Sequence, residues 1–115
     1  MSTVASGHER IDQRSLAMHR AIAEKLRARP ELLQIARDNI ERWYPCAGGS
    51  QPYLDEWRRM LDFPLEELIS LFLQDNQRMT ALRQASPFAG VLEPKERWII
   101  YDRFAPALGR AASDA

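Results

Sequence analysis

The side chains that most often carry out catalysis are few in this chain, and they form no recognisable catalytic motif. The sequence has two histidines, His8 and His19, and one cysteine, Cys46. It contains neither the H-E-x-x-H spacing of zinc hydrolases nor a pair of cysteines for metal binding. Cys46 lies in a glycine-rich segment with no histidine close in sequence, so no base is placed to activate its thiol. We therefore expect a non-enzymatic protein with no catalytic residue, no metal ligand and no cofactor.

The acidic residues and His19 are better suited to structural roles. Acidic pairs at 55–56 and 66–67 are neighbours in sequence, and neighbouring side chains on a helix point in different directions. A general acid–base pair usually needs one carboxyl group whose pKa is raised by burial, and nothing in the sequence indicates such burial. His19 shares a helical face with Leu16 and Ile22. This spacing predicts a histidine in the core or at a helix boundary.

Arginines lie close to aromatic residues at several places in the chain. Fourteen of the 16 basic residues are arginine, and Arg97 and Arg103 flank Trp98 and Tyr101. This combination is typical of protein interfaces and of surfaces that bind single-stranded nucleic acid. Acidic residues lie among the same arginines and the formal net charge is zero, which would cancel the field that a phosphate backbone needs. An ion-paired surface and a protein interface are the favoured interpretations, and nucleic-acid binding is not favoured.

The segment LRQASPFAGVLEPKERW, residues 82–98, is the most distinctive part of the sequence. Proline after Ser86 ends a helical run, and Gly90 allows a backbone conformation that other residues avoid. Phe88 is apolar although it lies in a loop. Two interpretations are open: Phe88 and Leu92 fold back as a plug on the fourth expected helix, or the apolar loop is presented to a partner. The residues expected to bind that partner are Arg83, Ser86, Pro87, Phe88, Gly90, Leu92, Arg97 and Trp98.

The elements that must position these residues are helices. Apolar residues recur at spacings of three and four, and prolines stand at or near the expected starts. Ser15, Asp62, and Asp75 or Asn76 are the expected N-caps. The short apolar run at the last helix offers two inward faces, Trp98 with Tyr101 or Ile99 with Phe104. The expected helices span residues 15–29, 30–44, 52–61, 64–75, 76–85 and 94–104, and the fifth could equally be a kinked continuation of the fourth.

The pattern predicts an all-α fold, a compact bundle of five to six short helices with proline-marked starts. Residues 14–104 are expected to form one helical domain, since 115 residues with 45% hydrophobic content suffice for one core. Residues 1–13 are expected to form a flexible N-terminal arm and residues 105–115 a flexible C-terminal tail. Whether the first two helices pack on the rest or extend from it is left open.

The composition also bears on location. A single cysteine allows no internal disulfide, which is typical of a reducing compartment. No apolar run reaches the roughly 18 residues that span a bilayer, and the N-terminus lacks a basic start followed by an apolar stretch. We expect a cytoplasmic protein that does not enter a membrane.

Three stretches together resemble a known class of proteins. SLAMHRAIAEKLRARPELL, YLDEWRRML and LRQASPFAGVLEPKERW look like small all-helical bacterial proteins that act as antitoxins in toxin–antitoxin gene pairs. The resemblance covers about residues 14–104. It implies a non-enzymatic cytoplasmic protein that binds and neutralises a co-encoded toxin. The sequence lacks the common plan of a DNA-binding half followed by a disordered toxin-binding tail, which puts autoregulation through DNA in doubt.

A small transcriptional regulator of the helix-turn-helix type is the alternative. The third to fifth expected helices could contain such a motif, with Arg78 and Arg83 near the DNA groove. The acidic pair Glu66-Glu67 at the start of the fourth helix fits poorly against phosphates.

Overall fold

The computed structural model describes residues 7–104, with side chains from residue 11 onward. Within this range the chain forms six α-helices and no strand, which confirms the all-α fold. Three short 3-10 turns, at Pro30–Leu32, Tyr44–Cys46 and Gly48–Ser50, link the early helices. The helices are α1 (Gly7–Ala28), α2 (Leu33–Trp43), α3 (Gln51–Met60), α4 (Leu65–Phe72), α5 (Gln77–Gln84) and α6 (Pro94–Arg103).

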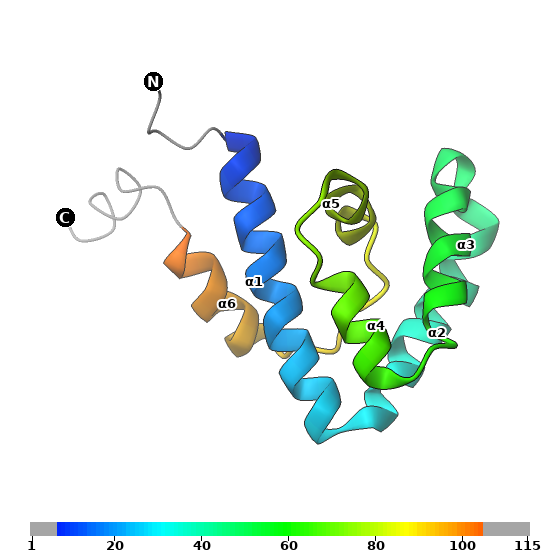
Figure 1. The fold of residues 1–115 in the computed structure, drawn as a ribbon, viewed down its shortest axis with the longest axis horizontal. Coiled ribbons are helices and arrows are strands. Elements are labelled where there is room, and N and C mark those ends of the chain that lie inside the picture. The colour runs from blue at the N-terminus through cyan, green and yellow to red at the C-terminus, as the bar shows by residue number, and fades with distance from the viewer. Residues whose placement is uncertain (1–6, 105–115) are drawn as a thin grey trace.

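The longest helix, α1, organises the bundle. It contacts α4, α5 and α6, while α2 packs against α3 and α4 against α5. In Figure 1, α6 lies beside α1, and α2 and α3 lie on the far side of α4 and α5. The first two helices therefore pack on the rest of the bundle. The yellow segment between α5 and α6 passes back across the molecule to reach α6.

Proline and a polar cap define most helix starts, as the sequence predicts. Pro52 lies in the first turn of α3, Pro64 precedes α4, and Pro94 begins α6. The Asn76 side chain accepts a hydrogen bond of 2.8 Å from the amide of Met79, so Asn76 is the N-cap of α5.

Two expected caps are wrong. The first helix begins at Gly7 and not at Ser15, because residues 8–28 contain neither proline nor glycine to break it. Residues 7–13, expected to belong to a flexible arm, are thus helical; residues 1–6 and the expected tail at 105–115 lie outside the described residues. Asp62 does not cap α4, and its carboxylate instead lies 3.6 Å from the guanidinium of Arg37.

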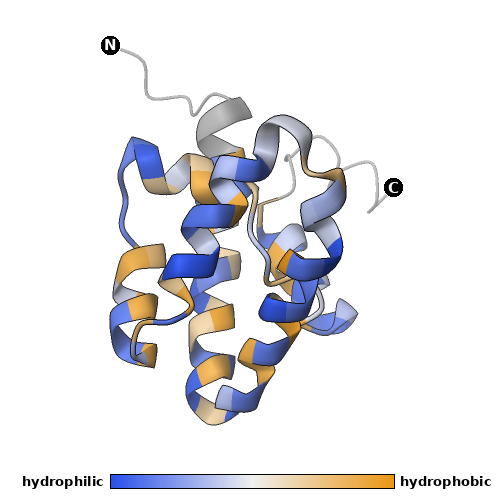
Figure 2. Ribbon diagram, turned by 90° about the vertical axis from the view of Figure 1, so that its right-hand side faces the viewer, coloured by the Kyte–Doolittle hydropathy of each residue, from blue (hydrophilic) through white to orange (hydrophobic). Residues whose placement is uncertain are grey.

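The core draws on all six helices and on the α5–α6 segment. Four rings meet at its centre: Trp57, Phe72, Phe88 and the imidazole of His19. Phe88 lies 5.2 Å from Phe72 and 5.5 Å from Trp57, centroid to centroid, in tilted and edge-on arrangements that aromatic pairs prefer. Figure 2 shows hydrophobic and hydrophilic bands alternating along the helices, as expected of helices with one buried side. The other large core residues are Ile22, Leu26, Ile40, Leu54, Met60, Leu61, Leu68, Ile69, Met79, Leu82, Val91, Leu92 and Ile100.

The rotation of α6 differs from both expected inward faces. Ile100 is its buried residue, Phe104 is half-buried, and Trp98, Ile99 and Tyr101 are exposed. Two contacts set this rotation. The side chain of Glu96 accepts the backbone N–H of Glu93 in a capping box, and it also accepts a 2.6 Å bond from Lys25 of α1.

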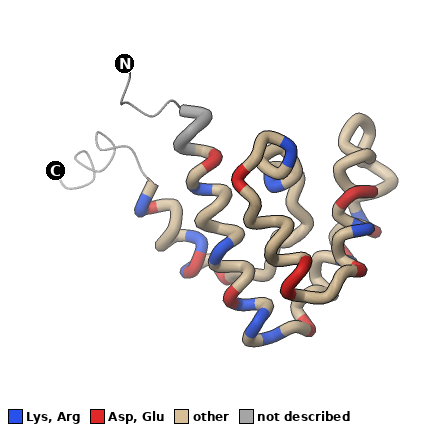
Figure 3. The backbone as a smooth tube through the Cα atoms, viewed as in Figure 1, with Lys and Arg blue, Asp and Glu red and all other residues tan. Residues whose placement is uncertain are grey.

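Charged residues of both signs alternate along the described backbone (Figure 3). Arg27 pairs with Glu24 and Glu66, and Arg58 pairs with Glu41. This arrangement agrees with the expected ion-paired surface. No helix of the described chain is both long and apolar enough to cross a membrane.

Candidate functional site

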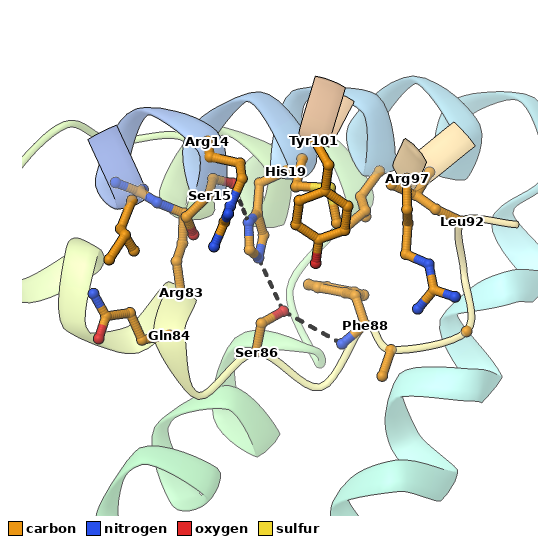
Figure 4. Close-up of a pocket in the computed structure, with 15 residues that line it drawn as sticks. Arg14, Ser15, His19, Arg83, Gln84, Ser86, Phe88, Leu92, Arg97 and Tyr101 are labelled. Atoms are coloured by element: carbon orange, nitrogen blue, oxygen red, sulfur yellow. Dashed lines mark hydrogen bonds between the residues drawn. The ribbon is translucent and has the colours of Figure 1, made fainter. Parts of the chain in front are cut away.

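A cavity of about 430 Å³ opens between α1, the α5–α6 segment and α6 (Figure 4). We call it the α1–α6 pocket. One wall comes from α1, the floor from the end of α5 and the segment after it, and the other wall from α6. Its lining residues are Ile11, Arg14, Ser15, Met18, His19, Ile22, Arg83, Gln84, Ser86, Phe88, Ala89, Gly90, Leu92, Arg97 and Tyr101.

Most residues that the sequence singled out for partner binding meet at this pocket. The two that do not line it are Pro87, which is fully buried, and Trp98, which lies outside on α6. Trp98 instead borders a neighbouring hollow with Pro94, Arg97 and Tyr101. The structure therefore brings together Arg83, Ser86, Phe88, Gly90, Leu92 and Arg97. Their binding of a partner stays a prediction.

Phe88 decides between the two interpretations of the loop. Its side chain is only 2% exposed and packs among the central rings, so the loop is a plug in the core. Phe88 also lines the α1–α6 pocket, where it forms part of the floor. The ring is not available as a protruding docking anchor.

Asn39 of α2 holds this loop in place, although no pattern in the sequence indicates that role. The buried Nδ2 of Asn39 donates hydrogen bonds of 2.8 Å to the carbonyl oxygens of both Pro87 and Ala89. Its own Oδ1 accepts from Arg42. Gly90 then turns the chain with a φ of 96°, a conformation that favours glycine. The expectation that Gly90 permits a reversal is confirmed.

His19 reaches the loop from the opposite side. Its Nδ1 lies 2.8 Å from the carbonyl oxygen of Ser15, so Nδ1 carries the proton and donates it. Nε2 is then the acceptor for the hydroxyl of Ser86, 2.9 Å away. The hydroxyl oxygen of Ser86 in turn accepts the amide of Phe88 at 3.3 Å. Figure 4 traces this chain of hydrogen bonds along the floor of the pocket.

Burial sets the protonation state of His19. Desolvation lowers its pKa to about 4; the hydrogen bond with Ser15 opposes this change, and the positive charge of Arg83 adds to it. The imidazole is therefore neutral near pH 7. The expectation of a core histidine is confirmed.

The distance between His19 and Ser86 is typical of a general base and its nucleophile, but the pKa of His19 is unfavourable for base catalysis. A general base works best when its pKa lies near the working pH. With a pKa of about 4, His19 accepts a proton poorly at neutral pH. The contact therefore serves to orient the Ser86 hydroxyl and to tie the loop to α1.

Arg83 is a buried charge that caps a helix. It is 3% exposed, and its Nη1 donates to the carbonyl oxygens of Phe72 at 2.9 Å and Gln74 at 2.7 Å, at the C-terminal end of α4. Burial lowers its pKa, opposed by the charges of Asp75 and Asp12. Its Nε has no hydrogen-bond partner within the described structure. Arg83 therefore belongs to the interior wall of the pocket and not to an outer surface.

The pocket is positively charged. Arg14, Arg83 and Arg97 line it, and none of the described side chains in its lining is acidic. The guanidinium of Arg14 lies 4.8 Å from the centre of the Tyr101 ring, a cation–π distance. Asp12 is the acid beside the rim, and its carboxylate accepts a 3.3 Å hydrogen bond from Gln84.

Metal binding finds no support in the part of the chain that the structure describes. No three His, Cys, Asp or Glu side chains gather there in a metal-binding arrangement. Cys46 is exposed, with a free thiol.

Comparisons with models of protein families, with curated proteins and with solved structures found no significant match to this chain.

Proposed function

We propose that this chain is a non-enzymatic, cytoplasmic protein-interaction module, the antitoxin-like partner that binds and neutralises a co-encoded bacterial toxin. The observation that carries the proposal is the outer face of α6, where large apolar side chains are exposed beside arginines.

The exposed face of α6 has the composition of a binding hot spot. Trp98 is 70% exposed, Ile99 62% and Tyr101 40%. The rings of Trp98 and Tyr101 meet edge to face with centroids 6.4 Å apart, so they form one continuous aromatic surface. Tryptophan, tyrosine and arginine dominate the energetics of protein interfaces. Leaving such side chains in water costs solubility, which a bound partner would offset.

This face is held in a fixed position, which favours tight binding. Ile100 buries the opposite side of α6, and the bond between Lys25 and Glu96 ties the helix to α1. The capping box of Glu93 and Glu96 holds its first turn. A preformed helix loses little conformational entropy when it docks, so more of the contact energy goes into affinity.

The helix-turn-helix alternative is less compatible with the geometry. Arg83, which would have to face a DNA groove, is buried against the end of α4. Arg78 is paired with Glu56. The start of α4 presents Glu66 and Glu67, whose charge would repel phosphates.

The proposal is tested by producing the chain together with the product of the neighbouring gene. We expect a stable complex and relief of the growth arrest that the neighbouring product causes alone. The variant Trp98→Ala should weaken the complex about tenfold or more, as loss of a central aromatic anchor does. Isothermal titration calorimetry of the purified pair measures this change.

Tyr53→Ala is the matched control, because Tyr53 of α3 is 41% exposed, like Tyr101, but lies on another helix. It should leave the affinity unchanged. A neighbouring product that neither arrests growth nor binds the chain would refute the antitoxin proposal. Equal losses for Trp98→Ala and Tyr53→Ala would refute the assignment of the face to α6.

A further inference from the structure

We propose that the α1–α6 pocket is a binding site for a small organic oxyanion, a carboxylate or phosphate attached to an apolar body. This site adjoins the outer face of α6, with which it shares Tyr101, and its occupation does not depend on a protein partner. The proposal rests on the charge, the shape and the unused hydrogen-bond donors of the pocket.

Two of the three arginines that line the pocket carry a charge that no described lining residue neutralises. Arg14 and Arg97 approach it from opposite walls, and neither guanidinium pairs with a carboxylate of the described chain. On the rest of the surface the arginines usually do pair, as Arg27 does with Glu66 and Arg58 with Glu41. Arginine presents its donors as a planar fork that matches the two oxygens of a carboxylate or phosphate. Two unpaired arginines at one cavity therefore favour an oxyanion.

The buried guanidinium of Arg83 adds a third, independent sign. Its Nη1 is engaged by the carbonyl oxygens at the end of α4, whereas its Nε is buried without a partner among the described residues. Buried donors without a partner are rare, because each has lost its hydrogen bonds to water and gained none in the protein. Arg83 lines the pocket, so an anion there would be stabilised by its charge.

The remaining lining specifies the rest of the ligand. Met18, Ile22, Phe88 and Leu92 provide apolar surface, which suits a ring or a branched chain. A cavity of about 430 Å³ falls within the range of small-molecule sites. The hydroxyl of Tyr101 is a further donor, whereas the proton of Ser86 is committed to His19. Inorganic phosphate alone would leave the apolar part of the pocket unused.

The site is also preformed. The contact of Ser86 with His19 and the two bonds from Asn39 hold the floor, and Lys25 with Glu96 holds the α6 wall against α1. A rigid pocket pays little ordering cost on binding, so even a small ligand can be retained.

The test is a titration of the full chain with small ligands, in which two-dimensional NMR spectra of the backbone amides are the readout. The probes are 4-phenylbutyrate, phenyl phosphate, inorganic phosphate and benzyl alcohol. We expect one or both organic anions to bind with a Kd of about 1 mM or below, which is reachable for fragments of this size. The amide signals of Ser86, Ala89 and Gly90 should shift. Benzyl alcohol and inorganic phosphate should bind about tenfold more weakly or not at all.

Charge-removing variants locate the site. Arg14→Gln and Arg97→Gln should each weaken the organic anion about tenfold, as loss of a charge-assisted hydrogen bond does. Arg103→Gln is the control, because Arg103 lies on α6 but does not line the pocket. The thermal midpoint of Arg97→Gln should match that of the parent chain, since Arg97 has no ion pair to lose within the described structure. Arg14→Gln also loses the cation–π contact with Tyr101 and should be slightly less stable.

Three outcomes would overturn the proposal: no shift with either organic anion up to about 10 mM, equal binding by benzyl alcohol, or unchanged affinity in the Arg14→Gln, Arg97→Gln double variant. Equal affinity for phenyl phosphate and inorganic phosphate would overturn the inference that the ligand has an apolar body. The titration uses the isolated chain, so its failure is separate from a failure of partner binding, which Trp98→Ala reports.

Discussion

The Nε2 atom of His19 lies 2.9 Å from the hydroxyl oxygen of Ser86, and this contact joins positions 67 residues apart in the sequence. It links the middle of α1 to the segment that leads into α6. Nε2 can accept this hydrogen bond only while His19 is neutral, because both nitrogens of a protonated imidazole are donors. Burial keeps the ring neutral near pH 7. The integrity of the pocket floor is therefore coupled to pH.

The first prediction concerns the pH dependence of stability. The pKa of His19 is about 4 in the folded chain and near 6.5 in the unfolded chain, so the unfolded state binds more protons between these values. The free energy of unfolding should rise with pH through this window and reach a plateau above about 6.5. Across this window the free energy of unfolding should rise by about 3 kcal/mol because of His19. Urea unfolding at a series of pH values measures it.

His19→Gln serves as the control for this slope. The variant should be less stable at pH 7 and should lose most of the slope between pH 5 and 6.5. The carboxyl groups of Glu66 and Glu96, whose pKa values are lowered by Arg27 and Lys25, lose their contributions only as the pH falls below about 4.5. A slope that persists in His19→Gln would show that another group is responsible.

The second prediction concerns Asn39. Replacing it with alanine leaves the carbonyl oxygens of Pro87 and Ala89 without their donor, and the Pro87 contact is buried. Loss of two such bonds should cost about 2–3 kcal/mol of unfolding free energy. Gln34→Ala, on the exposed side of the same helix, should change stability by less than about 0.5 kcal/mol. Equal effects in chemical denaturation would mean that Asn39 does not hold the loop.

The third prediction concerns Gly90, whose φ of 96° is strained for any residue with a Cβ atom. Gly90→Ala should destabilise the chain by about 1–2 kcal/mol. Steric overlap contributes little, because the added Cβ would lie 3.6 Å from Cγ2 of Ile35, an ordinary contact. Gly49→Ala is the matched control, with open space around it and no positive φ, and should be neutral or slightly stabilising. Thermal unfolding compares the two.

The fourth prediction separates core from surface. Phe88→Ala removes a ring from the centre of the core and should cost about 3–5 kcal/mol. Trp98→Ala removes a ring from the outer face of α6 and should change stability by less than about 0.5 kcal/mol. Urea unfolding of both variants gives the comparison. A large loss for Trp98→Ala would place that residue in the core and remove the basis for a docking face.

Much of the fold could be predicted from local patterns. Apolar residues three and four positions apart predict helices because that spacing lines up one helical face, and all six helices are present. Prolines indicate the starts of α3, α4 and α6 because their ring fits only the first turn of a helix. Gly90 could be identified as a reversal from its place between apolar residues.

The rotation of α6 could not be predicted in this way. Trp98, Ile99, Ile100 and Tyr101 are consecutive, so apolar residues point to every side of the helix. The face that becomes buried is chosen by Glu96, which is tied both to Glu93 and to Lys25 of α1. That choice leaves Trp98 on the surface.

The sequence by itself determined the fold class and the approximate helix boundaries, because helical periodicity and backbone restrictions act over a few residues. It also singled out eight residues for a binding site, of which six line the pocket. Only the tertiary structure decided that the Phe88 loop is a core plug, that Arg83 is buried, and that Arg14 and Tyr101 complete the pocket. The position of the loop depends on hydrogen bonds that join His19 to Ser86 and Asn39 to Pro87 and Ala89, about 50 or more positions away. A polar side chain has no local pattern that identifies such a distant partner, so the packing of the helices has to select it.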